Sequence, residues 1–239
     1  MDLALVTGAG RGLGAGIAHR LAERGWPVAV NDLPGRADAV VEAITRAGGT
    51  AVAAPADVTD EDEVRAMVAR LGPVGVLVVN ATGPQPVATV EELTWRAHLD
   101  QLEFFVKSPT LLVAAVLPGM RARGGGRIVQ IGSDMPDRAQ TGWSAYAAAK
   151  SAQRTLTRVW ARELGPAGIT VNVVAPGWIP VERHADASAA ERAEYAAEVP
   201  LRRMGTPPDV AGAVAFLASA DGAFVTGQCL TVNGGHTLG

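Results

Sequence analysis

The chain places a glycine-rich turn, residues 7–14 (TGAGRGLG), directly between a short apolar run and a stretch with helical spacing. The run LALV precedes the turn, and Leu13, Ile17 and Leu21 repeat at helical intervals until Gly25. Glycine permits a tight turn and lets backbone N–H groups approach a pyrophosphate at the positive end of a helix. This order predicts a dinucleotide-binding loop, and a purely structural glycine turn is the alternative.

Valine-rich runs and helical patterns continue to alternate along the rest of the chain. Strands are expected at residues 3–8, 27–32, 50–58, 74–83, 126–133, 168–177 and 229–235. Helices are expected at residues 12–25, 36–49, 60–72, 91–123 (kinked near Pro109), 143–164 and 208–220. Strands that are apolar on both sides predict a parallel sheet covered by helices on both faces. We therefore expect an α/β fold, a single-domain, doubly wound Rossmann sheet of about seven strands over residues 1–239. Residues 178–206 would form a helical lid over the substrate.

Composition narrows the classes of partner. The formal net charge of -3 gives no reason to expect nucleic acid or an anionic membrane as a partner. No uninterrupted apolar run approaches the ~20 residues of a membrane helix, and no Cys/His cluster suggests a metal site. The lone Cys229 excludes an internal disulfide and fits a reducing compartment, so we expect a cytoplasmic protein.

The second expected strand ends in Asp32, about twenty residues beyond the glycines. A carboxylate there accepts hydrogen bonds from an adenosine ribose and repels a 2′-phosphate, which favours NAD(H). Arg11 and Arg36 favour a phosphate instead, because guanidinium pairs well with phosphate oxygens. We expect NAD(H), with NADP(H) as the alternative.

Tyr146 and Lys150 lie four residues apart in an alanine-rich helix, so their side chains share one face. Hydride transfer at a carbonyl carbon needs a proton donor or acceptor at the oxygen, and a free phenol has a pKa of about 10. A neighbouring ammonium favours phenolate and can also relay a proton, which arginine cannot do. Only two of the 21 basic residues are lysines, Lys107 and Lys150, so a lysine here is informative. The alternative is a surface lysine beside a half-buried tyrosine.

Together these motifs resemble the short-chain dehydrogenase/reductase family over essentially the whole chain. The resemblance implies a catalytic group of Ser133, Tyr146 and Lys150, with Ser133 bonding the substrate oxygen. It also implies a set of cofactor-binding residues in addition to Asp32, Tyr146 and Lys150. These are Thr7, Gly8, Arg11, Gly12, Leu13, Gly14, Asp57, Val58, Asn80, Ala81, Pro176, Gly177 and Ile179.

The chain departs from the family pattern at four positions, which are Val79, Thr82, Val181 and Phe105. Phe105 stands where the family has an Asn whose backbone carbonyl holds a water in the proton path. Pro109 lies four residues later, and a proline leaves the carbonyl at i−4 without its helical partner. We therefore expect the relay to persist through the backbone of residue 105. Lys107 is a second candidate for the relay, with a solvated lysine as the alternative.

The resemblance to 3-oxoacyl-ACP-reductase-like members implies a ketone/secondary-alcohol oxidoreductase, with a 3-oxoacyl-type substrate and a homotetramer or homodimer. Residues bordering the expected pocket are Asp134, Met135, Gln140, Trp143, Trp178, His184 and Tyr195. Two other classes stay open: a non-catalytic NAD(P)-binding sensor, and a non-redox epimerase or dehydratase. The intact glycine loop and Lys150 argue against the family's dehalogenase branch.

Overall fold

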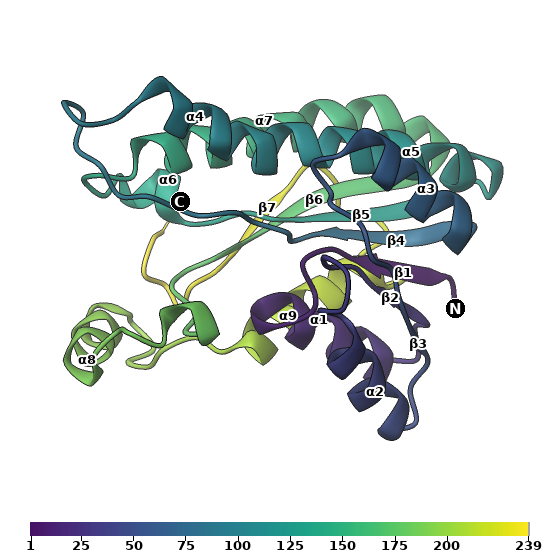
Figure 1. Cartoon of the computed structure of the whole chain (residues 1–239), viewed down its shortest axis with the longest axis horizontal. Helices are drawn as coiled ribbons and strands as arrows, with labels where there is room; N and C mark the ends of the chain where they lie inside the picture. The colour runs from purple at the N-terminus through teal and green to yellow at the C-terminus, as the bar shows by residue number, and fades with distance from the viewer. Residues whose placement is uncertain (239) are drawn as a thin grey trace.

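Seven parallel strands form one sheet in the order β3-β2-β1-β4-β5-β6-β7 in the computed structural model, which describes residues 1–238 (Figure 1). The strands are β1 Leu3–Val6, β2 Val28–Val30, β3 Ala51–Ala53, β4 Val74–Val79, β5 Gly126–Ile131, β6 Ile169–Pro176 and β7 Cys229–Val232. The strand order reverses between β1 and β4, and in such sheets ligands bind at the carboxyl ends of the strands beside this reversal. The Rossmann prediction is confirmed.

Helices cover both faces of the sheet (Figure 1). One layer contains α3 Glu61–Leu71, α4 Trp95–Leu102, α5 Ser108–Ala122 and α7 Ser144–Leu164. The other contains α1 Gly12–Glu23, α2 Asp38–Arg46 and α9 Pro207–Ala218. The short helices are α6 Met135–Arg138, η2 Gly165–Ala167 and η3 Glu182–His184.

Each helical layer seals its own hydrophobic core against the sheet. Ile17 and Leu21 of α1 pack with Val210 of α9 on one face. Met67 of α3 and Leu112 of α5 pack on the other. Every residue of β4 and β6 is buried, as expected for strands covered on both sides. The carboxyl ends of these strands are thereby held as a rigid platform.

The helical stretch expected at residues 91–123 begins at Trp95, after Thr94, whose hydroxyl accepts a hydrogen bond from the N–H of Ala97. The stretch is interrupted by a π-helix, η1 Glu103–Lys107, in which the Ser108 N–H donates to the Glu103 carbonyl. The irregularity expected near Pro109 therefore takes the form of a π-turn just before the proline.

By length and composition the composite helix, residues 95–122, would pass as a membrane span. Its Leu112, Val116 and Met120 are instead buried in the core beside β4. This is the arrangement of a helix that covers a sheet.

The segment 178–206 is helical, as expected, and holds η3 and α8 Ala189–Glu198. It lies beyond the carboxyl ends of the strands, apart from the two helical layers (Figure 1). Helix α8 starts with a reciprocal cap, because Ser188 Oγ accepts from the Glu191 N–H (3.1 Å) and Glu191 Oε2 accepts from the Ser188 N–H (2.7 Å).

Candidate active site

The glycine loop after β1 contains several positions at which only glycine fits. Gly8 and Gly12 both have a φ of 60°, which favours glycine. A Cβ on Gly14 would lie 2.4 Å from the carbonyl oxygen of Gly8, and one on Gly10 would lie 2.4 Å from that of Arg36. Gly12 is the first residue of α1, so the free N–H groups of this helix face the loop. The loop is therefore shaped as an anion-binding turn.

Thr7 and Asn80 brace the ends of β1 and β4. The Thr7 hydroxyl oxygen accepts from the N–H groups of Asn80 (3.0 Å) and Ala81 (3.2 Å). The Asn80 amide donates to the carbonyls of Thr7 (2.9 Å) and Gly8 (3.0 Å). These two residues of the expected cofactor set thus tie the ends of β1 and β4 together where the strand order reverses.

Asp32 lies beside the same loop at the end of β2. Its carboxylate accepts from the N–H of Gly10 (3.0 Å) and from that of Leu33 (2.9 Å). The side chain is partly exposed, while Arg11 and Arg36 are exposed. A fixed negative charge therefore borders the loop on its outer side.

Four further residues of the expected cofactor set are one polar residue that fixes a turn and three apolar residues that pack into the cores. Asp57 Oδ1 accepts from the N–H (2.8 Å) and hydroxyl (2.7 Å) of Thr59, which fixes the turn after β3. Val58 and Ile179 are buried in the two cores, and Leu13 packs partly buried against the core beside α1. These apolar side chains anchor the loops from behind.

The loop that follows β6 lies at the same edge of the sheet as the glycine loop. Pro176 is the last residue of β6, and its carbonyl accepts from the Asp134 N–H at 3.0 Å. A Cβ on Gly177 would lie 2.5 Å from the Tyr195 hydroxyl. That hydroxyl accepts from the Trp178 N–H at 2.8 Å, so only glycine permits this close approach.

Ser133 and Tyr146 meet where β5 ends and α7 begins. The Ser133 hydroxyl oxygen accepts from the Met135 N–H at 3.1 Å, and Ser133 lies near enough to Tyr146 to lower the pKa of its phenol. Arg154 holds the Ser133 carbonyl at 2.7 Å while it forms an ion pair with Asp137. The serine is therefore fixed from both its backbone and its side chain.

The pKa of Tyr146 is raised, mainly because the surrounding protein desolvates the phenol. The nearby Ser133 hydroxyl and the charge of Arg183 lower this pKa, and Asp134 raises it. We expected Lys150 to lower this pKa, but desolvation outweighs the lowering influences in the structure. The expected common face is present, since the Lys150 Nζ lies 5.7 Å from the centre of the Tyr146 ring.

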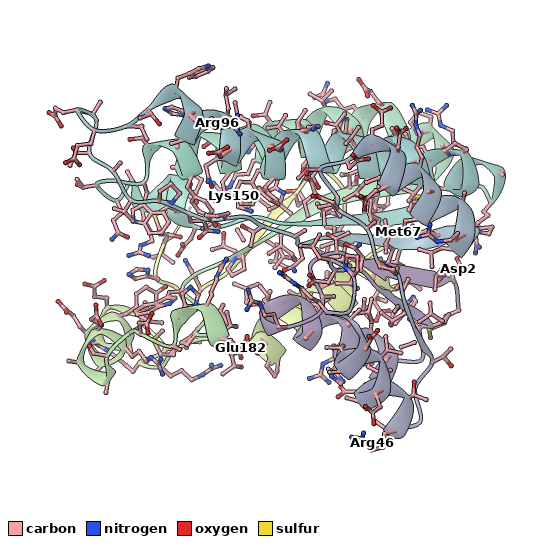
Figure 2. All side chains as sticks on the ribbon, viewed as in Figure 1. Asp2, Arg46, Met67, Arg96, Lys150 and Glu182 are labelled. Carbon is pink, nitrogen blue, oxygen red and sulfur yellow. The ribbon has the colours of Figure 1, made fainter. Side chains whose placement is uncertain are left out.

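Lys150 is buried between α7 and the sheet (Figure 2). Its Nζ donates to the Ile131 carbonyl (2.7 Å) and to Gln153 Oε1 (3.2 Å). The Phe105 ring lies beneath it, with 3.7 Å between Nζ and the ring centre. Burial holds the pKa of Lys150 well below its ordinary value, and the charge of Arg183 lowers it further.

Phe105 is buried in the π-helix and packs edge-on against Tyr146, with ring centres 5.4 Å apart. Lys107 is half-exposed and donates to Glu103 at 3.2 Å, as a solvated helix pair does. The solvated interpretation of Lys107 thus fits its surroundings. The relay through the carbonyl of residue 105 stays a prediction.

Aromatic side chains surround the expected substrate side. Trp143 packs edge-on against Tyr146 (5.6 Å between ring centres), and Trp178 packs edge-on against Tyr195 (5.4 Å) and His184 (6.1 Å). A cavity of about 90 Å³ beside α8 is lined by Trp178, Tyr195 and ten neighbours. His184 Nδ1 accepts from a backbone N–H at 3.3 Å, and desolvation lowers its pKa. This histidine is a structural part of η3.

Buried polar groups close the other side of this region. Asp134 is buried and accepts from Asn233 Nδ2 at 3.1 Å, and desolvation raises its pKa. Met135 is buried beside it, whereas Gln140 is exposed. Within residues 1–238 no group of three or more His, Cys, Asp or Glu side chains is arranged to hold a metal ion.

Sequence reasoning missed four residues of this site: Gly10, Gln153, Glu182 and Arg183. Glu182 Oε1 accepts from the Gly12 N–H at 3.4 Å, so η3 reaches the glycine loop across 170 residues of sequence. Figure 2 shows Glu182 in the gap between η3 and α1. Two of the four left a signal: Gly10 lies inside the glycine-rich run, and Gln153 is a polar residue three positions after Lys150 on the buried face of α7.

Known proteins resemble this chain over nearly its full length. Residues 8–237 match the family model described as enoyl-(acyl carrier protein) reductase. A cis-4-hydroxycyclohexanecarboxylate dehydrogenase of Sinomonas cyclohexanicum is 40% identical over 98% of this chain and 96% of the relative. A 3-oxoacyl-[acyl-carrier-protein] reductase of Staphylococcus aureus is 39% identical over 97% of this chain and 96% of its own.

Two solved structures extend the comparison to three dimensions. A gluconate 5-dehydrogenase from Burkholderia cenocepacia J2315, in complex with NADP and tartrate, is 33% identical with a TM-score of 0.92, covering 98% of this chain and 94% of its own. A blue fluorescent protein from a metagenomic library, in complex with NADPH, is 38% identical with a TM-score of 0.90. The match covers 99% of this chain and 98% of that protein's chain. The fold is thus shared with proteins whose solved structures hold NADP or NADPH.

Proposed function

Because the chain belongs to the short-chain dehydrogenase/reductase family and is an NAD(P)-dependent ketone/alcohol oxidoreductase, we propose that Ser133, Tyr146 and Lys150 carry its catalysis. The observation that supports this most is the pair formed by Tyr146 and the buried Lys150, whose Nζ lies 5.7 Å from the centre of the Tyr146 ring and donates to the Ile131 carbonyl. It lies at the carboxyl end of β5, the edge of the sheet that also carries the glycine loop. A phenol held there is in the place where a ligand binds in such sheets.

The protein residues divide the proton chemistry among themselves. Ser133 donates a hydrogen bond to the carbonyl oxygen of the substrate, and Tyr146 gives that oxygen a proton, or takes one from the alcohol. Lys150 supplies a positive charge behind the phenol, which favours the phenolate during alcohol oxidation. The nicotinamide, when bound, supplies or accepts the hydride.

The glycine loop fits a dinucleotide. Added Cβ atoms at Gly8, Gly10 and Gly14 would collide with the protein's own backbone, so glycine is what lets the loop turn tightly into the start of α1. The Glu182 carboxylate already accepts from the Gly12 N–H, which supports an anion-binding role for the start of α1. The pyrophosphate would bind there, and Asp32 would face the adenosine ribose.

We infer a preference for NAD(H) from the fixed carboxylate of Asp32. The two solved relatives described above hold NADP and NADPH, so this inference sets the chain apart from them. Fluorescence titration with NADH and NADPH tests it directly. A dissociation constant at least about tenfold lower for NADH supports the preference, and tighter binding of NADPH overturns it.

We propose a small 3-oxoacyl thioester or comparable ketone as substrate, by similarity to the 3-oxoacyl-[acyl-carrier-protein] reductase. A screen of 3-oxoacyl thioesters, cyclic hydroxy acids and simple secondary alcohols separates the substrate classes. Tyr146→Phe should lower turnover on any active substrate about a thousandfold. The matched control is Tyr195→Phe, which removes the only other phenol and should affect mainly KM. Cofactor binding without turnover on any substrate would instead support a sensor.

We propose a homotetramer as the assembly and the cytoplasm as its location. Large apolar side chains stand exposed on α4 and around β7, namely Trp95, Leu99, Phe216, Phe224 and Leu230. Burying them against a second copy removes apolar surface from water. Light scattering in solution and cell fractionation test the two proposals. The segment 178–206, which reaches the loop through Glu182, is proposed as the lid.

A further inference from the structure

The Lys150 ammonium is held in a seat made only of protein groups. We define the lysine seat as the Phe105 ring, the Ile131 carbonyl and the Gln153 side-chain oxygen. The Lys150 Nζ lies 3.7 Å from the centre of the ring, 2.7 Å from the carbonyl oxygen and 3.2 Å from the side-chain oxygen. An ammonium has three donors, and two of them are used by these oxygens. The face of an aromatic ring carries negative potential and attracts a cation at this distance.

A local change of helix type lies where Phe105 enters this seat. The π-helix Glu103–Lys107 adds about one residue to the turn, which changes the direction of the side chains in it. Pro109 follows, and it has no N–H to donate to the carbonyl of residue 105. Phe105 is 2% exposed, and its ring meets both Lys150 and Tyr146. The ring therefore touches both members of the proposed catalytic pair.

Gln153 occupies a position that otherwise favours an apolar residue. It is 1% exposed on the face of α7 that covers the sheet. A buried amide is unfavourable unless its polar atoms are paired, and its oxygen is paired with Lys150. Thr157 donates to the Gln153 backbone carbonyl at 3.1 Å and accepts from Gln130 at 2.7 Å. The side-chain oxygen is thus committed to Lys150, while the backbone of the same residue is held by its neighbour Thr157.

We propose that Phe105 and Gln153 are positioning residues that keep the Lys150 ammonium charged and aimed at Tyr146. The proposal rests on the proposed function, in which Lys150 must be charged to favour the Tyr146 phenolate. It also explains why a phenylalanine serves at a position beside the proton path. The ring contributes the electrostatic attraction of its face where a polar side chain would contribute a hydrogen bond.

The charges around the lysine seat determine how a substitution in it should change the pKa of Lys150. Lys150 faces Tyr146 on its own helix and Arg183 on η3, and Asp134 acts on the same phenol. Burial and Arg183 both lower the pKa of Lys150. The two seat residues oppose this lowering, so removing either one must lower the pKa further.

The chain offers an unusually clean measurement, because it contains two lysines only. Lysine labelled with ¹³C at Cε gives two NMR signals, and Lys107→Arg removes one and thereby assigns the other to Lys150. We expect Phe105→Leu and Gln153→Met each to lower the titration midpoint of Lys150 by about one pH unit. Phe105→Tyr keeps the ring face and should retain the midpoint. Gln153→Glu adds a negative partner and should raise it.

The matched control is Phe104→Leu, the same change one residue earlier in a ring that packs on Gly83. It should leave the Lys150 midpoint in place, and a shift equal to that of Phe105→Leu would overturn the proposal. Unchanged midpoints in Phe105→Leu and Gln153→Met would overturn it as well. If Phe105→Leu does not fold, the opposite shifts of Gln153→Met and Gln153→Glu carry the test.

Activity provides an independent readout. With an active substrate, Phe105→Leu should lower kcat more than KM and move the pH profile of kcat, while Phe105→Tyr restores both. If no substrate is turned over but the midpoints shift as expected, the proposed function fails and the lysine seat stands. If substrates are turned over but the midpoints do not move, the seat fails and the proposed function stands.

Discussion

Replacing Asp32 by Asn tests how the chain distinguishes NAD(H) from NADP(H). The carboxylate is held by the N–H groups of Gly10 and Leu33 at 3.0 and 2.9 Å, so it cannot turn away from an incoming ribose. A 2′-phosphate would bring a charge of about −1.5 to −2 to this carboxylate. At about 4 Å, each pair of unit charges costs about 1 kcal/mol in water and about 4 kcal/mol near a protein surface.

The partly exposed Asp32 lies near the lower end of this range. Removing its charge should therefore strengthen NADPH binding by about 2–3 kcal/mol, or roughly 30- to 150-fold. Asn keeps one accepting oxygen, so one of the two hydrogen bonds to the loop is retained and the other is lost. NADH loses a charge-assisted hydrogen bond to its ribose and should bind roughly five- to tenfold more weakly.

The assay is equilibrium titration of both reduced cofactors by fluorescence, with thermal melting to confirm that the variant is folded. Asp38→Asn is the matched control, since the same change in the exposed first turn of α2 should alter neither affinity more than about twofold. A ratio of the two affinities in Asp32→Asn that stays within about threefold of the parent would refute the electrostatic reasoning.

Three other substitutions probe the loop, the lid and the buried lysine. Gly14→Ala forces a Cβ to within 2.4 Å of the Gly8 carbonyl oxygen. The free energy of unfolding, measured by urea denaturation, should fall by about 2–3 kcal/mol. Gly212→Ala, in a helix and with open space around it, should raise it by about 0.5–1 kcal/mol, and equal effects would contradict the steric argument. Glu182→Gln removes a carboxylate that accepts from Gly12 and should tighten NADH binding about fivefold, an effect that must shrink at high salt if it is electrostatic. Lys150→Met removes a buried group with a lowered pKa, at the cost of activity and of the hydrogen bonds to the Ile131 carbonyl and Gln153 Oε1. Between the lowered pKa and about 10.4 the unfolded parent binds more protons than the folded one, so its stability rises with pH; this slope should be smaller in the variant.

Local sequence was enough to predict most elements because their hydrophobic periods are unambiguous. Residues 74–79 are apolar without interruption and form β4, with every residue buried. Ile17 and Leu21 mark the buried face of α1. The helix expected from residue 91 begins at Trp95, because the Thr94 hydroxyl caps it there. A cap of this kind is decided by backbone geometry as much as by residue type.

The candidate site was only partly readable in the same way. The spacing of Tyr146 and Lys150 predicted their common helix face, and the structure shows it. The predicted lowering of the Tyr146 pKa was wrong. The shift depends on how deeply the surrounding elements bury the phenol, and in the structure it is upward. Glu182 could not be found from sequence at all, because 170 residues separate it from the loop residue that it contacts.

The sequence alone determined the order of strands and helices, the glycine loop and the tyrosine–lysine pair, since each depends on neighbours within about one turn of helix or one strand. Only the tertiary structure decided what surrounds Lys150. Gln153 is a neighbour of Lys150 on the same helix, but Phe105 and Ile131 come from a π-helix and a strand that meet this helix only after the sheet has formed. Burial and the field at an ammonium depend on these distant groups, and no local pattern encodes their approach.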